Sequence, residues 1–256
     1  MINEENIVNE YLALGKLDLA LEEAKKNGFN ELAKKIESSL LKDKNSYLKH
    51  YEQNNNRVPG AQVTAGWGLD GRQSCALSHI VELSADSLLD IGCADGSFIF
   101  NCLHKNVIKQ GVGVDAWKEG IAWAKQFGTT NFSSRSLFFQ GLFEEHSDYL
   151  LTSLFPFKAI HIGEVLEHVL DPINILAKAK TLLRSDGGIV VTVPVKRPPL
   201  TQHEKAILTS GDVNEHMRYI DLDTLEKYAD TCGLKIIKKQ YDGNHWVNLI
   251  ATLGLG

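Results

Sequence analysis

The sequence contains no C-x-x-C pair and no long apolar run. Its cysteines stand far apart in apolar or helical contexts, which predicts free thiols rather than disulfides or a zinc site, as in a reducing cytoplasm. No segment approaches the roughly 20 consecutive apolar residues of a membrane helix, and residues 1–15 lack a basic region followed by an apolar core. We therefore expect a cytoplasmic protein outside the membrane. The four cysteines are Cys75, Cys93, Cys102 and Cys232.

Positive charge is also scarce, because 27 Lys and Arg residues stand against 32 Asp and Glu residues, for a net charge of −5. Such a chain has no general positive field that would hold a polyanion, so nucleic acid is not an expected partner. Hydrophobic residues make up 43% of the 256 residues and charged residues 23%, the composition of a soluble globular protein. This length allows one large domain with a small appendage.

The N-terminal part, residues 1–53, has leucines at helical spacing, with Gly15 and Gly28 as breaks. Residues 11–28 resemble one helical hairpin of a tetratricopeptide array. A solenoid needs at least about three such repeats, and about one is found, so we expect a helical extension that acts as a cap or arm. It could serve homo-oligomerisation or a protein partner.

Residues 54–74 hold the densest cluster of turn-forming residues and are interpreted as a linker or lid. At this place Trp67 and Arg72 could lie over a ligand, with Arg72 able to clamp a carboxylate. The alternative is an ordinary surface loop that contains one packed tryptophan.

From residue 75 to residue 256, helix and strand patterns alternate, which predicts a parallel, doubly wound, Rossmann-like sheet. Seven strands are expected. Only Tyr241–Asn244 separates the last two, and a parallel crossover needs about a dozen residues or more, so these strands should form an antiparallel hairpin. The fold class is therefore α/β with a helical N-terminal extension.

Two apolar runs ending in acids indicate a nucleotide-type ligand. In Leu88–Phe98, LLDIGCADGSF, the glycines Gly92 and Gly96 would let the backbone approach a ligand closely. Asp115 follows Gly96 by 19 residues (115 − 96), where nucleotide-binding α/β folds place a carboxylate for ribose hydroxyls. The dinucleotide fingerprint G-x-G-x-x-G is absent, so a pyrophosphate cradle is not expected.

These motifs resemble the first two cofactor motifs of the class I S-adenosylmethionine-dependent methyltransferases. The resemblance extends to GEVLEHVLDP at Gly163–Pro172 and to Leu182–Pro194, and it covers about residues 75–253. It implies S-adenosylmethionine as cofactor. It also implies these binding residues: Asp90, Gly92, Cys93, Gly96, Asp115, Ala116, Trp117, Leu142, Phe143 and Gly163.

The stretch after the third strand departs from the family pattern. Many members carry an Asp there for the adenine amino group, whereas this chain has Gly141–Glu144. We therefore expect Leu142 and Phe143 to bind adenine through backbone and apolar contacts. Trp117 has two interpretations, since it could lie beside adenine or ribose or could pack against the sheet.

The acceptor side is predicted from Glu164, Glu167 and His168, which would share one face of a helical turn. Either His168 or Glu164 could take a proton from an acceptor hydroxyl. Alternatively, E-x-x-E-H resembles the metal motif of small-RNA 2′-O-methyltransferases and of some ubiquinone-pathway O-methyltransferases, although no metal site is assigned. A third interpretation is structural, because the helix dipole favours Glu in a first turn.

The connection Lys196–Tyr219 is long and polar, with His203 and His216 as further candidates, and is expected to wall the acceptor pocket. Its composition favours a hydroxylated or sugar-like acceptor. The sequence thus predicts a methyltransferase acting on an oxygen of a small or carbohydrate-like molecule. Two alternatives remain: a non-catalytic cofactor-binding module that docks a partner through its helices, and a metal-dependent RNA 2′-O-methyltransferase, which conflicts with the acidity.

Overall fold

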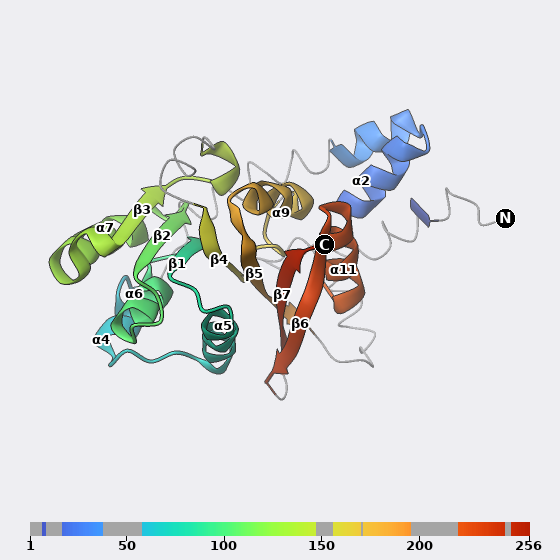
Figure 1. Ribbon diagram of the computed structural model, residues 1–256. Coiled ribbons are helices and arrows are strands. Elements are labelled where there is room, and N and C mark those ends of the chain that lie inside the picture. The colour runs from blue at the N-terminus through green and yellow to red at the C-terminus, as the bar shows by residue number, and fades with distance from the viewer. Residues whose placement is uncertain are drawn as a thin grey trace.

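The computed structural model describes residues 7–8, 17–37, 58–146, 156–169, 171–195, 220–243 and 247–256. A seven-stranded sheet forms its centre, in the order β3-β2-β1-β4-β5-β7-β6 (Figure 1). Strands β1 to β5 pair in parallel, and β7 runs antiparallel to both β5 and β6. The strands are β1 (Ser87–Ile91), β2 (Gln110–Asp115), β3 (Ser136–Gln140), β4 (Phe157–Gly163), β5 (Leu183–Val195), β6 (Leu234–Asp242) and β7 (Val247–Leu255). The predicted fold class is confirmed.

Helices cover both faces of the sheet, and each face has its own core. One core contains Leu176 of α9 and Tyr228 of α11, and the other contains Ile80 of α5, Ile99 of α6 and Ile121 of α7. These helices are α4 (Ala61–Thr64), α5 (Gly71–Glu82), α6 (Ser97–His104), α7 (Lys118–Phe132), α9 (Pro172–Thr181) and α11 (Leu222–Thr231), with short 3-10 turns η1 (Ser133–Arg135) and η2 (Phe143–Glu145). This double covering explains why the parallel strands read as unbroken apolar runs.

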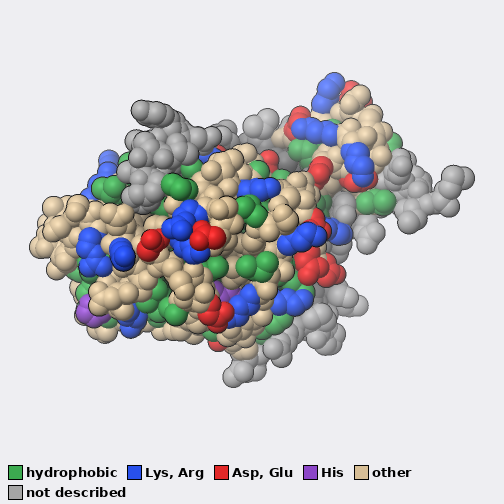
Figure 2. Space-filling view, in the orientation of Figure 1, with side chains coloured by type: hydrophobic (Ala, Val, Ile, Leu, Met, Phe, Trp, Pro, Cys, Tyr) green, Lys and Arg blue, Asp and Glu red, His purple; other side chains and the backbone are tan. Residues whose placement is uncertain are grey.

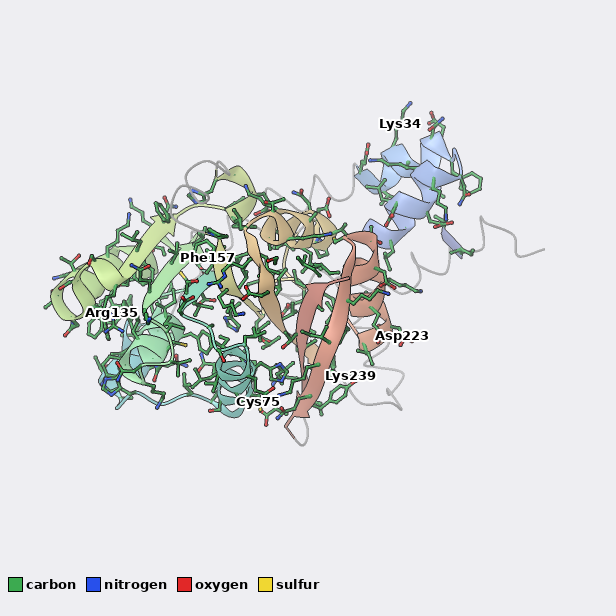
Figure 3. The ribbon with its side chains drawn as sticks, viewed as in Figure 1. Lys34, Cys75, Arg135, Phe157, Asp223 and Lys239 are labelled. Atoms are coloured by element: carbon green, nitrogen blue, oxygen red, sulfur yellow. The ribbon has the colours of Figure 1, made fainter. Side chains whose placement is uncertain are left out.

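Local sequence signals set the beginnings of several helices. Asp70 accepts the backbone N–H of Gln73 and forms a capping box at α5, and Asp171, followed by a proline at the first helical position, caps α9. Side-chain exposure follows the layers: Phe157 at the start of β4 lies inside, whereas Asp223 and Lys239 lie on the outer surface (Figure 3).

The described N-terminal residues form α2 (Leu17–Lys26) and a second helical stretch over residues 30–37. They share a small core that includes Ala20, Ala24 and Ile36, whereas Leu19 belongs to the core of the α9 and α11 face. The helical pair therefore contacts the α/β domain through Leu19. Whether residues 1–53 act as a separate unit stays a prediction.

The strand order reverses between β1 and β4, since the chain runs outward from β1 through β2 to β3 and then returns to the other side of β1. Open α/β sheets bind ligands at the carboxyl ends of the strands beside such a point. The fold thus places the ends of β1, β2 and β4 around one position. None of the described helices is long and apolar enough to span a membrane.

Candidate active site

A cavity of about 620 Å³ opens at the carboxyl ends of the strands, under residues 58–73 that precede and begin α5. Of the residues predicted to bind the cofactor, together with Glu164 and His168 as proton acceptors, all except Gly96 line it. Those lining residues are Asp90, Gly92, Cys93, Asp115, Ala116, Trp117, Leu142, Phe143, Gly163, Glu164 and His168. The proposed cofactor and acceptor residues therefore share one space.

Asp115 joins the end of β2 to the loop after β1. Its carboxylate accepts the backbone N–H of Trp117 at 2.7 Å through Oδ1 and that of Ala94 at 2.8 Å through Oδ2. These bonds fix the carboxylate at the cavity wall. Each carboxylate oxygen has a further lone pair, so Asp115 can also accept hydrogen bonds from a ligand's hydroxyl groups.

Two features require a glycine at position 92: its backbone conformation and the close approach of Val165. Its φ of +75° lies in the left-handed region, and a Cβ there would overlap Cγ2 of Val165 in the turn after β4. Gly96 precedes α6 and also has a φ of +75°, but a Cβ there would lie 2.5 Å from the Phe138 ring rather than in the cavity. Gly96 therefore lets α6 begin close to β3.

Asp95 lies in the loop between β1 and α6 and also lines the cavity. Its Oδ2 accepts the backbone N–H of Gly60 at 2.7 Å, and its Oδ1 accepts that of Ser97 at 3.1 Å. The first bond holds the segment before α4 over the cavity, which Ala61 and Gln62 line. The second satisfies the N–H of Ser97, the first residue of α6, whose N-cap Gly96 has no side chain to do so.

Lys178 of α9 holds the loop after β3 in place. Lys178 Nζ lies 5.2 Å from the centroid of the Phe143 ring and donates to the backbone oxygen of Glu144 at 3.1 Å. Phe143 is buried, and with Leu142 it lines the cavity. This end of the cavity is therefore apolar and rigidly held.

The buried ring of Trp117 packs on Gly120 in the first turn of α7, and Trp117 also lines the cavity. Its place beside adenine or ribose stays a prediction. Cys93 is buried and also lines the cavity. Burial, and after it the charges of Asp115 and Asp90, raise the pKa of this thiol well above its usual 9.0. Cys93 is thus a neutral, apolar part of the wall.

The segment after β4 contains a single turn, closed between Val165 and His168, and not a helix. The N–H of His168 donates to the backbone oxygen of Val165 at 2.8 Å, and Glu164 precedes the turn with a φ of +55°. Glu164 and His168 line the cavity, whereas Glu167 is buried at 1% exposure and does not. Within the described residues, no three His, Cys, Asp or Glu side chains are placed to hold a metal ion.

Glu164 is held by charged and polar partners. Its Oε2 lies 3.1 Å from Nη1 of Arg72, and its Oε1 accepts the hydroxyl of Thr192 at 3.3 Å. Burial raises the pKa of Glu164 above 4.5, and Arg72 and Thr192 oppose this shift without cancelling it. A carboxyl group with a raised pKa is a stronger base when ionised.

Of the two candidates in residues 54–74, only Arg72, the second residue of α5, lines the cavity. Trp67 stacks on His104 with ring centroids 4.2 Å apart and lies edge-on to Phe132. It is partly buried and packs against the core beside α6 and α7, as the alternative of a packed tryptophan predicts. His203 and His216 lie outside the described residues.

Comparison with known proteins agrees with this geometry. A family model described as "Methyltransferase domain" matches residues 25–239. The chain belongs to this methyltransferase family. Its members use S-adenosylmethionine, and the chain is accordingly an S-adenosylmethionine-dependent enzyme.

Solved methyltransferase structures show the same fold. An S-adenosylmethionine-dependent methyltransferase from Clostridium acetobutylicum matches with a TM-score of 0.57 at 13% identity, over 77% of this chain and 96% of that one. The methyltransferase domain of bacterial CtHen1 matches with a TM-score of 0.53 at 16% identity, over 72% and 97%. At these identities the likeness establishes the fold and not the substrate.

A relative of higher sequence identity is the tRNA U34 carboxymethyltransferase of Trichodesmium erythraeum (strain IMS101). It is 26% identical over 134 residues, which are 52% of this chain and 39% of that protein. The chain therefore matches less than half of this relative.

The cavity of this methyltransferase fits the cofactor of its family. Asp115 would offer acceptor-only oxygens to ribose hydroxyls, and the loop of Leu142 and Phe143 would offer an apolar surface to adenine. Among the described lining residues, Asp and Glu outnumber Lys and Arg, of which Arg72 is the one present. This excess of carboxylates suits a ligand that carries a sulfonium cation.

Proposed function

We propose that the protein transfers the methyl group of S-adenosylmethionine to an oxygen of a small or carbohydrate-like acceptor, with Glu164 as the proton acceptor. The observation that carries this proposal is the place of Glu164: it lies in the same cavity as Asp115, at the carboxyl end of β4. His168 is the alternative proton acceptor in that cavity. We assign the methyl acceptor atom as oxygen because a carboxylate base lies beside the polar side chains of Arg72 and Thr192.

The bound cofactor supplies an electrophilic methyl carbon, so the chain's own contribution is alignment, exclusion of water and removal of a proton. Alignment of two reactants can supply about 7–11 kcal/mol of the barrier. General-base catalysis adds roughly 10²- to 10⁴-fold. Loss of the base should therefore slow the transfer without abolishing cofactor binding.

Arg72 and Thr192 support this role of Glu164. They bond different oxygens of the carboxylate, at 3.1 Å and 3.3 Å, so the side chain has one orientation. The left-handed backbone of Glu164, with its N–H on the backbone oxygen of Thr192 at 2.9 Å, is strained in the way that functional residues often are. A positioned, partly desolvated carboxylate meets the geometric and electrostatic requirements of a general base.

The test compares Glu164→Gln with His168→Asn. Transfer of a labelled methyl group is measured against a panel of hydroxylated acceptors that includes sugars, and binding of S-adenosylhomocysteine is measured by calorimetry. We expect Glu164→Gln to lower turnover roughly 100-fold or more while cofactor affinity stays within about threefold. Glu226→Gln, an exposed change on α11, is the matched control.

Full activity in Glu164→Gln would rule out the proposed base. A loss confined to His168→Asn would move the role to His168. Cofactor binding with no methyl transfer to any acceptor would favour the non-catalytic, partner-docking interpretation, for which the N-terminal helices are the predicted surface.

A second candidate is a carboxymethyl transfer, as the name of the Trichodesmium relative describes for that protein. The supporting observation is that Arg72 is the only Lys or Arg among the described residues that line the cavity. A transferred group with its own carboxylate would need such a cation. Arg72 already pairs with Glu164 and Asp70, however, which favours simple methyl transfer.

An RNA acceptor has less support. On the face drawn in Figure 2, Lys and Arg side chains are interspersed with Asp and Glu, and the chain carries a net charge of −5. Nucleic-acid sites are commonly marked by clustered basic side chains. Competitive binding of S-adenosylmethionine and of a cofactor carboxylated on its methyl carbon would separate methyl transfer from carboxymethyl transfer. A transfer assay with bulk tRNA would then test the RNA acceptor.

A further inference from the structure

A buried carboxylate–histidine pair lies at the floor of the cavity. His161 Nδ1 is 2.7 Å from Asp90 Oδ1, with His161 exposed by 7% and Asp90 by 2%. The two residues are register partners on the adjacent strands β4 and β1. The sequence prediction included Asp90 as a cofactor-binding residue but missed His161.

The pair has a defined orientation. A carboxylate only accepts hydrogen bonds, so Nδ1 of His161 carries the hydrogen in this pair. In the tautomer that carries only this hydrogen, Nε2 is an acceptor. The ring of Phe98, the second residue of α6, lies over the imidazole with centroids 4.3 Å apart. Asp90 and Phe98 together hold the ring in one position.

Gly163 keeps the other edge of this ring open. A Cβ at position 163 would lie 2.5 Å from Cε1 and 2.8 Å from Nε2 of His161. The Cε1–Nε2 edge is thus directed along β4 toward its carboxyl end. Both His161 and Gly163 line the cavity, so this edge faces the ligand space.

The strand order indicates which part of the cofactor lies there. The cofactor consists, in order, of adenine, ribose, sulfonium and a methionine chain with an α-ammonium and an α-carboxylate. Adenine is assigned to the loop after β3 and ribose to Asp115 after β2, and the next strands in the sheet are β1 and β4. The methionine end therefore falls above Asp90 and His161.

We propose that His161 is a cofactor-binding residue whose Nε2 accepts a hydrogen bond from the α-ammonium group of the cofactor, and that Asp90 is its positioning residue. An ammonium group donates and never accepts, so it matches the acceptor that Asp90 leaves on the ring. The excess of carboxylates in the cavity also favours a cation. Asp90 then acts through His161, which explains why so buried a carboxylate lies in a binding motif.

Calorimetric titration tests this proposal without methyl transfer, so its outcome is separate from that of the proposed function. Two ligands are compared: S-adenosylhomocysteine and its analogue in which hydrogen replaces the α-amino group. We expect the parent protein to bind the first about tenfold or more tightly than the second. Equal affinities would overturn the proposal without any substitution.

Substitution sharpens the result. His161→Leu should lower affinity for S-adenosylhomocysteine about tenfold and leave affinity for the des-amino analogue within about twofold, so that the preference disappears. Asp90→Asn should reduce the preference in the same direction. His104→Leu, an exposed histidine of α6 that does not line the cavity, is the matched control.

Thermal unfolding shows whether each variant is folded, and His161→Gln replaces His161→Leu if the latter is not. The ratio of the two affinities is the decisive quantity, because a merely structural role would weaken both ligands equally. Equal weakening would overturn the proposal. A changed preference for a decarboxylated analogue instead would show that His161 binds the α-carboxylate, and would also overturn it.

Discussion

The two ends of the cavity are built by different means. At the cofactor end, backbone N–H groups of Ala94 and Trp117 bind the Asp115 carboxylate at 2.8 and 2.7 Å. At the acceptor end, side chains bind side chains, as in the contact of Glu164 with Arg72 at 3.1 Å. Backbone contacts depend on chain conformation and persist through most substitutions, whereas side-chain contacts change with each residue. The proposed ribose site can therefore stay fixed while the proposed acceptor end changes specificity. Within the proposed cofactor end, the His161–Asp90 pair is the exception, because it joins two side chains.

The largest effect should come from the backbone-bound carboxylate. Asp115→Ala removes the proposed ribose ligand and leaves two N–H groups at the cavity wall without their acceptor. We expect affinity for S-adenosylhomocysteine to fall roughly 100-fold or more, about 2.7 kcal/mol. Calorimetry measures this, with the exposed Asp223→Ala of α11 as control. A loss below about threefold would show that Asp115 does not hold the cofactor.

A smaller effect should come from the contact that joins the two ends. Gly92→Ala places a methyl group on Cγ2 of Val165 and in left-handed backbone, so the turn after β4 must move. We expect stability to fall by about 2 kcal/mol and cofactor affinity roughly tenfold. Thermal unfolding and calorimetry measure these changes.

The companion change Val165→Ala distinguishes steric overlap from backbone strain. It should recover part of the loss and leave about 1 kcal/mol for the left-handed conformation. Gly68→Ala is the control, since nothing lies within 4 Å of its added methyl group and its backbone is not left-handed. No recovery in the double variant would show that the Gly92–Val165 contact does not link the two ends.

The same contrast explains what the sequence could predict. The strands, Asp115 and the loop after β1 follow from local signals, namely apolar runs, glycines and spacing, because backbone-built sites depend on residues close in sequence. His161 and Thr192 were missed because each faces a partner far away in the chain: Asp90 on β1 for His161, and Glu164 just after β4 for Thr192. Such pairs depend on strand order and register, which no local pattern contains.

The turn after β4 shows a second limit. The spacing of Glu164, Glu167 and His168 predicted one helical face, but a φ of +55° at Glu164 rotates its side chain out of that pattern. A non-glycine residue rarely adopts this conformation, so sequence periodicity does not include it. Trp67 and Arg72 are likewise only five residues apart, but Arg72 lines the cavity whereas Trp67 packs on His104.

The smallest predicted effect is a change of pH dependence at the acceptor end. Arg72→Gln removes the charge that lowers the pKa of Glu164, so burial raises that pKa further above 4.5. If Glu164 must be ionised to act, the acidic limb of the rate profile should move to higher pH. We expect roughly half to one pH unit, since both side chains keep about a quarter of their exposure to water. The control is Arg184→Gln, whose partners Asp86 and Asp186 lie outside the cavity.

Stability should show the same linkage with a defined sign. The pKa of Glu164 is raised in the folded state, so its contribution to stability is full below the unfolded value near 4.5 and is lost as pH rises through the folded value. In Arg72→Gln the folded value is higher still, so this loss extends over a wider pH range. The difference in melting temperature between the parent and Arg72→Gln should therefore be small below pH 4.5 and grow toward neutral pH. A pH-independent difference would mean that Arg72 stabilises the acceptor end through packing and not through its charge on Glu164.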